Sequence, residues 1–327
     1  MQKRAFRWAV LGPGNIANTF AQALAAWPDA TLAAVGSRDL GRAQAFAQQY
    51  GAPRAYGSYE KLAEDDGIDA VYIATPHPKH CEHALLCLER GKPVLVEKPF
   101  AINAAQARRM AEAARANGVF LMEAMWTRFL PAMDRVRQWV AQGRIGEPRM
   151  LQADFSFRAG ADPRSRLLNP ALGGGALLDV GIYVLELATM FFGAHPASVH
   201  ADAHIGDTGV DEQTAITLRY ADGALAALTC AVRTQGTQTA TLFGTQGRIE
   251  LGQFWKAQSL RLLAGDEVVE ENHPMMVNGF EYEIREAMDC ITAGQAESPR
   301  MALAESVAVL EIMDGIRASL GLRYPME

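Results

Sequence analysis

The sequence predicts an α/β fold: an N-terminal domain with a doubly wound parallel sheet, then an α+β domain with a large, mostly antiparallel open sheet. Short apolar runs alternate with helical stretches over the first third, and a glycine-rich turn directly follows the first run. In the second half, consecutive strand-like runs are joined by short turns. A chain of 327 residues is long enough for about two domains. We place the first domain at 1–123 and the second at 124–327.

The first domain follows a strict alternation of strand and helix patterns. The run 70–74 is continuously apolar, which is typical of a strand buried on both faces of a parallel sheet. Gly51 and Gly91 each follow a helical stretch and suit its carboxyl end. We predict six parallel strands, with strand patterns at 8–11, 31–35, 70–74, 94–96 and 119–122, and helices at 16–26, 42–50, 79–90 and after Asn103.

The second domain has a different pattern. Turns such as Asp222-Gly223 and 244–247 separate its strand-like runs, and consecutive strands with short turns indicate an antiparallel sheet. The strand-like runs lie at 149–157, 198–204, 213–220, 224–233, 238–243, 248–251, 259–263 and 267–270. Helices are predicted at 132–142, 176–192, 279–293 and 301–320.

Charge and cysteine content narrow the class of protein. Lys and Arg total 31 and Asp and Glu total 37, so the net charge of −6 argues against a nucleic-acid binder that acts through bulk positive charge. The four cysteines form no CxxC pair, so we expect neither a disulfide framework nor a thiolate zinc site. A reducing, cytoplasmic setting is therefore expected.

Two segments bear on export and membranes. Polar and glycine residues interrupt the N-terminal apolar stretch from Arg7 to Asn15, so we expect no export signal. The most apolar long window, 176–194, contains Asp179 and Glu186, which favours a buried helix over a membrane span. No membrane partner is expected.

The glycine-rich turn, Gly12-Pro13-Gly14-Asn15-Ile16-Ala17, predicts a dinucleotide site in a Rossmann domain. Gly12 permits a tight turn, Gly14 lets the backbone approach a pyrophosphate, and Ala17 still allows close packing of helix on strand. The N-terminus of the following helix, at Asn15 and Ile16, offers free N–H groups to phosphates.

The end of the second strand pattern bears on the choice between NADP and NAD. An NAD site places an acidic residue there, whereas this chain has Ser37 followed by Arg38, which can pair with a 2′-phosphate. NADP is therefore favoured. Asp39 keeps NAD open, because a register two residues later would restore an acid.

Polar residues that end a strand or interrupt an apolar helix are the candidates for chemistry. Lys98 ends the run 94–96 at the edge where ligands bind in parallel sheets, and Pro99 favours an extended backbone before it. Asp179 and Tyr183 are four residues apart and share one face of a helix. An aspartate in such an apolar helix needs a partner, for which we consider Lys98 or a substrate hydroxyl. A purely structural role for Asp179 and Tyr183 remains open.

Together, the glycine turn, the tripeptide Glu97-Lys98-Pro99 and the stretch from Gly173 through Asp179 to Tyr183 resemble the Gfo/Idh/MocA oxidoreductase family. The stretch 123–131 is similar to its branch of dihydrodiol and NADP-dependent sugar dehydrogenases. This resemblance implies that Lys98 lies beside a nicotinamide, that Tyr183 is the acid/base, and that the open sheet joins a homodimer or higher homo-oligomer. The cofactor-binding residues that we assign besides those of the glycine turn, Ser37 and Arg38 are Thr75, Pro76, His77, His80, Glu97, Lys98, Trp126 and Arg128.

Histidines and aromatic residues complete the candidates. The family often has Asn at the position of His77 and, in inositol dehydrogenases, His at that of Tyr183, so inositol is a less favoured substrate. His77, His80 and His83 do not complete a metal-ligand set with carboxylates, and we expect no metal. Trp126, Phe155 and Phe157, with Asp179, are assigned to the substrate pocket, although core packing explains the aromatic residues equally well.

The expected reaction moves a hydride between a nicotinamide cofactor and a secondary alcohol or carbonyl. Tyr183 exchanges the hydroxyl proton, Lys98 favours its ionised form, and Asp179 orients a neighbouring group. A sugar, a polyol or a trans-dihydrodiol suits this apparatus. Two alternatives stay open: an NAD-dependent glycosidase that uses transient oxidation, and a non-catalytic NADPH-binding sensor.

Overall fold

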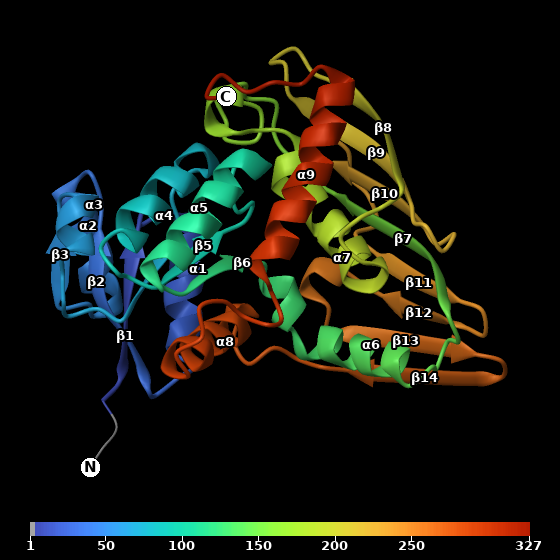
Figure 1. Ribbon diagram of the computed structural model, residues 1–327, viewed down its shortest axis with the longest axis horizontal. Coiled ribbons are helices and arrows are strands. Elements are labelled where there is room, and N and C mark those ends of the chain that lie inside the picture. The colour runs from blue at the N-terminus through green and yellow to red at the C-terminus, as the bar shows by residue number, and fades with distance from the viewer. Residues whose placement is uncertain (1–3) are drawn as a thin grey trace. The chain divides into compact units, whose positions relative to one another are not determined.

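The computed structural model describes residues 4–327, which divide into two compact units (Figure 1). Unit 1 comprises the described residues up to Ala101 with Ala105–Trp126 and Met276–Ser306, and unit 2 comprises Ile102–Ala104, Thr127–Met275 and Val307–Glu327. The segment Met276–Ser306, which the sequence analysis placed in the second domain, therefore belongs to unit 1.

Unit 1 is built on a six-stranded sheet whose neighbouring strands are all parallel, in the order β3-β2-β1-β4-β5-β6. This confirms the predicted doubly wound sheet. β3 is the strand that the sequence analysis did not place, because three residues are too short to show a period. The strands are β1 (Phe6–Leu11), β2 (Ala30–Gly36), β3 (Arg54–Tyr56), β4 (Ala70–Ile73), β5 (Val94–Glu97) and β6 (Leu121–Ala124).

Helices connect these strands, and unit 1 also contains α8, a helix from much later in the chain. That later helix, α8, packs against α1: Trp27 Nε1 donates to the Glu281 carbonyl at 2.8 Å, and Asn278 Nδ2 donates to the Thr19 carbonyl at 2.9 Å. These contacts place the segment in unit 1. The helices are α1 (Asn15–Leu24), α2 (Leu40–Tyr50), α3 (Tyr59–Ala63), the 3₁₀ turn η1 (His77–Lys79), α4 (His80–Leu88), α5 (Ala104–Asn117) and α8 (Phe280–Thr292).

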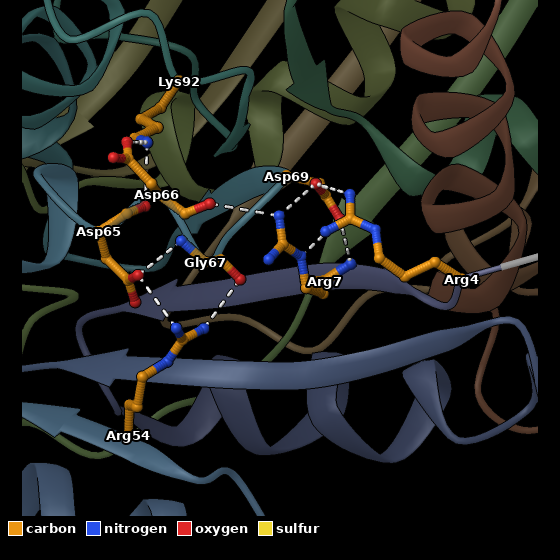
Figure 2. A network of polar contacts seen from close by, with 8 residues as sticks. All are labelled: Arg4, Arg7, Arg54, Asp65, Asp66, Gly67, Asp69 and Lys92. Atoms are coloured by element: carbon orange, nitrogen blue, oxygen red, sulfur yellow. Dashed lines mark hydrogen bonds and ion pairs between the residues drawn. The ribbon is translucent and has the colours of Figure 1, made fainter.

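A network of charged groups surrounds the amino-terminal ends of the parallel strands (Figure 2). Arg7, near the start of β1, pairs with Asp69 just before β4 at 2.9 Å. Arg54, at the start of β3, pairs with Asp65 at 3.0 Å, and its guanidinium also donates to the Gly67 carbonyl. These groups lie away from the carboxyl ends of the strands, where this class of sheet binds its ligands.

Unit 2 is built on an eight-stranded sheet in the order β14-β13-β12-β11-β7-β10-β9-β8. Every neighbouring pair is antiparallel except β7 and β10, which are parallel, so the prediction of a mostly antiparallel sheet is confirmed. The strands are β7 (Pro148–Ser156), β8 (Ser198–Ile205), β9 (Asp211–Arg219), β10 (Leu225–Ala231), β11 (Ala240–Gly244), β12 (Arg248–Leu251), β13 (Ser259–Ala264) and β14 (Glu267–Asn272).

Helices α6, α7 and α9 lie on one side of this sheet (Figure 1). Along β9 and β10 buried and exposed residues alternate, so one face packs on the core and the other is exposed. The apolar stretch Pro170–Phe192 has the length and hydropathy of a membrane span, but 83% of its window is buried, as expected for a core helix. The helical elements are η2 (Trp126–Phe129), α6 (Pro131–Ala141), η3 (Pro170–Leu172), the π-helix η4 (Leu177–Gly181), α7 (Ile182–Phe192), η5 (Phe254–Lys256) and α9 (Leu303–Leu320).

Candidate active site

The glycine-rich turn has the geometry that a dinucleotide pyrophosphate requires. Gly12 adopts a left-handed φ of +94°, and a Cβ at this position would lie 2.8 Å from Thr75 Cγ2. α1 begins directly after Gly14, and no side chain caps its first N–H groups. A Cβ built on Gly14 would meet nothing within 4 Å, so the backbone is open to close approach. Gly12, Gly14, Asn15 and Ile16 therefore fit a phosphate cradle.

The end of β2 carries the three residues on which the choice between NADP and NAD depends. Ser37 is buried, and its Oγ accepts from the Asp39 backbone N–H at 3.2 Å. Asp39 caps α2, since its carboxylate accepts from the Arg42 N–H at 3.1 Å. Arg38 is exposed. Asp39, the acidic residue that would favour NAD, thus serves as the cap of α2. The Arg38 guanidinium at the end of β2 is accessible to a phosphate.

Four residues that we assigned to the cofactor follow β4. Thr75 is buried at the strand end, Pro76 is exposed and His77 is half-buried. His80 is fully buried, with Nε2 2.8 Å from the Thr75 carbonyl oxygen and Nδ1 2.9 Å from the Pro99 carbonyl oxygen. Both nitrogens of the His80 ring therefore face the protein main chain.

Lys98 lies at the carboxyl end of β5, as predicted, and is half-buried. The preceding Glu97 is buried and accepts a hydrogen bond from the Tyr72 hydroxyl. The peptide bond between Lys98 and Pro99 is cis. The lysine that the sequence singled out is thus at the ligand-binding edge of the parallel sheet.

Trp126 and Arg128, also assigned to the cofactor, are both buried. The Trp126 ring packs on Phe280 with centroids 5.1 Å apart. Arg128 Nη1 donates to Glu186 Oε2 at 2.9 Å, and both side chains are less than 10% exposed. Such an enclosed ion pair fixes the η2 segment to α7 within unit 2.

Asp179 and Tyr183 lie in a helix that begins irregularly. The sequence analysis predicted one helix over 176–192, but residues Leu177–Gly181 form a π-helix, a rare geometry that often marks functional sites. Asp179 is buried and accepts from Arg166 Nη1 at 2.7 Å. Asp179 therefore has a guanidinium partner that the sequence analysis did not consider. Tyr183 is 6% exposed.

Aromatic rings pack around Tyr183 in unit 2. The Phe155 and Tyr183 rings meet edge to face with centroids 5.1 Å apart, and Phe155 stacks on Trp255 at 5.0 Å. Phe157 is half-buried, with its centroid 6.5 Å from that of Phe155. Phe155 therefore packs in the core of unit 2, next to Tyr183.

Sequence reasoning missed the polar partners of the candidate residues. Arg166 lies in a loop with no periodic signal, so nothing in the sequence links it to Asp179. The position of Glu186 in an apolar helix does predict a partner for its charge. In the structure that partner is Arg128. Asp211, the buried acceptor for the Leu177 N–H at 2.7 Å, gave none. Among residues 4–327, no group of three or more His, Cys, Asp or Glu side chains is arranged to hold a metal ion.

The parallel sheet and the glycine turn of unit 1 define a dinucleotide-binding Rossmann domain of the kind found in NAD(P)-dependent oxidoreductases. Residues 6–125 match the Gfo/Idh/MocA oxidoreductase family with its NAD-binding Rossmann fold, and residues 133–250 match the Gfo/Idh/MocA C-terminal domain. The chain belongs to the Gfo/Idh/MocA oxidoreductase family, as the sequence motifs indicated.

Relatives of known activity extend over the whole chain. It is 40% identical to the trans-1,2-dihydrobenzene-1,2-diol dehydrogenase of Mus musculus over 99% of both chains, and 40% identical to that of Danio rerio with the same coverage. KijD10, a 3-ketoreductase from Actinomadura kijaniata solved with NADP, is 28% identical with a TM-score of 0.86 over 96% of this chain and 98% of that one. The aldose-aldose oxidoreductase from Caulobacter crescentus is 27% identical with a TM-score of 0.89 over 98% and 99%.

Proposed function

We propose that this enzyme oxidises a secondary hydroxyl group of a trans-dihydrodiol, with sugars and polyols as the second substrate class, and that it prefers NADP. The observation that carries the proposal is the aromatic cluster of Phe155 and Trp255 beside Tyr183, which favours a flat, partly apolar ring over a strongly hydrated sugar. Similarity to trans-dihydrobenzenediol dehydrogenases over 99% of the chain supports it. The 3-ketoreductase and aldose oxidoreductase neighbours support the second class.

Each candidate residue has a defined task in this proposal. The N-terminus of α1 and the glycine turn bind the pyrophosphate, and Arg38 binds the 2′-phosphate. When bound, the nicotinamide ring supplies the acceptor or donor of the hydride. Tyr183 takes the hydroxyl proton during oxidation and returns it during reduction. Lys98 assists the reaction with a positive charge at the ligand-binding edge of the parallel sheet, and Asp179, held by Arg166, accepts a hydrogen bond from a substrate hydroxyl.

Replacement of Tyr183 by Phe tests the assignment. Because only the hydroxyl is lost, we expect kcat to fall by about a hundredfold or more while NADPH still binds, as measured by absorbance of reduced nicotinamide and by fluorescence titration. The assay uses dihydrodiols and a panel of sugars and polyols, with NAD and NADP side by side.

Tyr220→Phe is the matched control. It removes a buried hydroxyl that has no hydrogen-bond partner among the described residues, and we expect its kcat to stay near that of the wild type. Near-normal turnover in Tyr183→Phe would overturn the acid/base assignment. Sugar release without net cofactor reduction would identify a glycosidase, and tight NADPH binding without turnover on the whole panel would identify a sensor.

We further propose a homodimer formed through the exposed face of the eight-stranded sheet, in the cytoplasm. On β9 and β10 this face carries small, uncharged side chains, which suit close packing of two sheets. These residues are Ala215, Thr217, Ala227 and Thr229, and they line a shallow groove. Cys81, Cys87, Cys230 and Cys290 are free and buried, which supports a reducing compartment.

A further inference from the structure

His80 is a fully buried histidine between two strand ends of unit 1. Its ring nitrogens lie 2.8 Å from the Thr75 carbonyl oxygen and 2.9 Å from the Pro99 carbonyl oxygen. Thr75 follows β4 and Pro99 follows β5, and these strands are neighbours in the sheet. A single imidazole ring therefore contacts the main chain at both strand ends, on the edge where this class of sheet binds a dinucleotide.

Both ends of this bridge are next to residues of the proposed function. On the β4 side, a Cβ added to Gly12 would lie 2.8 Å from Thr75 Cγ2, so Thr75 packs directly on the glycine turn. On the β5 side, the carbonyl group that faces His80 belongs to the residue after Lys98. His80 thus connects the cofactor turn to the candidate lysine through two main-chain contacts.

The backbone around Lys98 is held on both sides. Before it, Glu97 accepts a hydrogen bond from the Tyr72 hydroxyl, and after it, the Phe100 N–H donates to Glu123 Oε1 at 2.9 Å. A lysine side chain has four rotatable bonds. Its ammonium group therefore has a defined position only where the backbone that carries the side chain is fixed. A displacement of about 1 Å at a reacting group can cost about a hundredfold in rate.

The ionisation of His80 suits a positioning role better than proton transfer. Burial lowers its pKa to about 4, the Pro99 and Thr75 carbonyls oppose that shift, and the nearby charges of His83 and Lys98 reinforce it. At pH 7 the neutral ring carries one N–H, so it donates a hydrogen bond to one of the two carbonyl groups and only packs against the other. With no exposed surface, the ring has no access to a substrate.

We propose that His80 is a positioning residue that fixes the ends of β4 and β5 relative to one another and thereby sets the position of the Lys98 ammonium. This inference rests on the proposed role of Lys98 in the reaction. His80 acts through the Pro99 main chain, so its contribution to turnover depends on Lys98 being present.

A double-mutant cycle tests this dependence. His80→Phe keeps a ring of similar size and removes its hydrogen bond to the main chain, and we expect kcat to fall by about tenfold or more. His80→Gln retains an N–H donor and should have an intermediate kcat. In the Lys98→Met background, His80→Phe should lower kcat by less than twofold, because the group that it positions is absent. Rates are divided by the concentration of NADPH-binding sites, so that loss of folded protein is not counted.

His83→Phe is the matched control on the same helix. His83 Nδ1 lies 2.9 Å from the Thr75 hydroxyl, and its ring packs on Tyr59, at 4.6 Å between centroids. His83→Phe should change kcat by the same factor in the wild-type background and in the Lys98→Met background. An equal loss from His80→Phe in both backgrounds overturns the inference and leaves the proposed function intact. Where His80→Phe does not fold, His80→Gln is taken through the same cycle.

A different result separates failure of the proposed function from failure of the inference. If Lys98→Met alone retains normal kcat, the assisting role of Lys98 is wrong, and the role of His80 through it is wrong as well. If Lys98→Met lowers kcat and the His80 effect disappears in that background, both proposals are supported.

Discussion

Glu283, in α8, is a carboxyl group enclosed completely by protein. Its side chain is 0% exposed, and neither oxygen has a hydrogen-bond partner among residues 4–327. Burial raises its pKa well above the ordinary value, and the neighbouring Glu97, Glu123 and Glu281 raise it further. The ionised form is therefore strongly disfavoured in the native state, whereas the unfolded chain ionises this group near pH 4.3.

Glu283→Gln should change the pH dependence of stability. Above about pH 4.3 the native wild type binds a proton that the unfolded chain releases, so its stability falls as pH rises, by up to about 1.4 kcal/mol per pH unit until the native pKa is reached. Glutamine does not titrate, so the variant lacks this loss. Thermal unfolding should show a Tm advantage for the variant that is larger at pH 8 than at pH 5.

Glu112→Gln, at an exposed position of α5, is the control for the same chemical change, and thermal unfolding of both variants is compared with that of the wild type at pH 5 and pH 8. If the Tm difference between Glu283→Gln and the wild type is equal at pH 5 and pH 8, then Glu283 ionises alike in the native and the unfolded state.

The π-helix Leu177–Gly181 is the element that carries Asp179, and its start depends on a glycine. Gly175 has φ of +115°, and a Cβ there would lie 2.3 Å from Asp211 Oδ1. The same carboxylate accepts from the Leu177 N–H at 2.7 Å and from the Thr214 hydroxyl at 2.8 Å. Gly175 thus provides the space in which Asp211 holds the first turn of the helix.

Gly175→Ala should displace this turn. We expect a loss of roughly 1–3 kcal/mol in unfolding free energy, from the left-handed backbone and the contact with Asp211, and a lower kcat as Asp179 shifts. Thermal unfolding and steady-state kinetics measure the two effects. Gly160→Ala, at a position with no heavy atom within 4 Å of the added Cβ, should leave both near wild type. A stable, fully active Gly175→Ala would show that the turn does not need this space.

For the whole molecule, the exposed face of the eight-stranded sheet bears on the oligomeric state. Ala227 lies on this face in β10, between Thr217 on β9 and Gln152 on β7. In a two-fold dimer through this face the substituted residue is present in both copies, so a single charged residue is introduced twice into one interface.

Ala227→Arg should therefore shift the protein from the mass of two chains to that of one in sedimentation velocity, because two bulky charged side chains would have to be enclosed where the two sheets pack. Ala116→Arg, the same change at an exposed position of helix α5, is the control and should leave the mass unchanged. A wild-type protein that sediments as one chain, or an Ala227→Arg variant that keeps the mass of two, would contradict the proposed interface.

Much of the fold was predictable because burial leaves a periodic trace in the chain. The continuous apolar runs of β1, β4 and β5 identified a parallel sheet, and the turn Gly12-Pro13-Gly14 located its ligand-binding edge. Three-residue β3 was not placed, because too few residues alternate to reveal a period. The position of α8 in unit 1 was missed for a different reason: its pattern shows which face is buried, and not that α1 covers it.

The sequence by itself determined the order of the longer elements, the Rossmann sheet and the candidates Lys98, Asp179 and Tyr183. These depend on local periodicity and on which residue types stand at strand ends. The tertiary structure alone decided the parallel pairing of β7 with β10, the contact of Arg166 with Asp179 and the enclosure of His80 between two carbonyl groups. These features join residues from separate segments, and the path of the chain between them determines which polar groups meet.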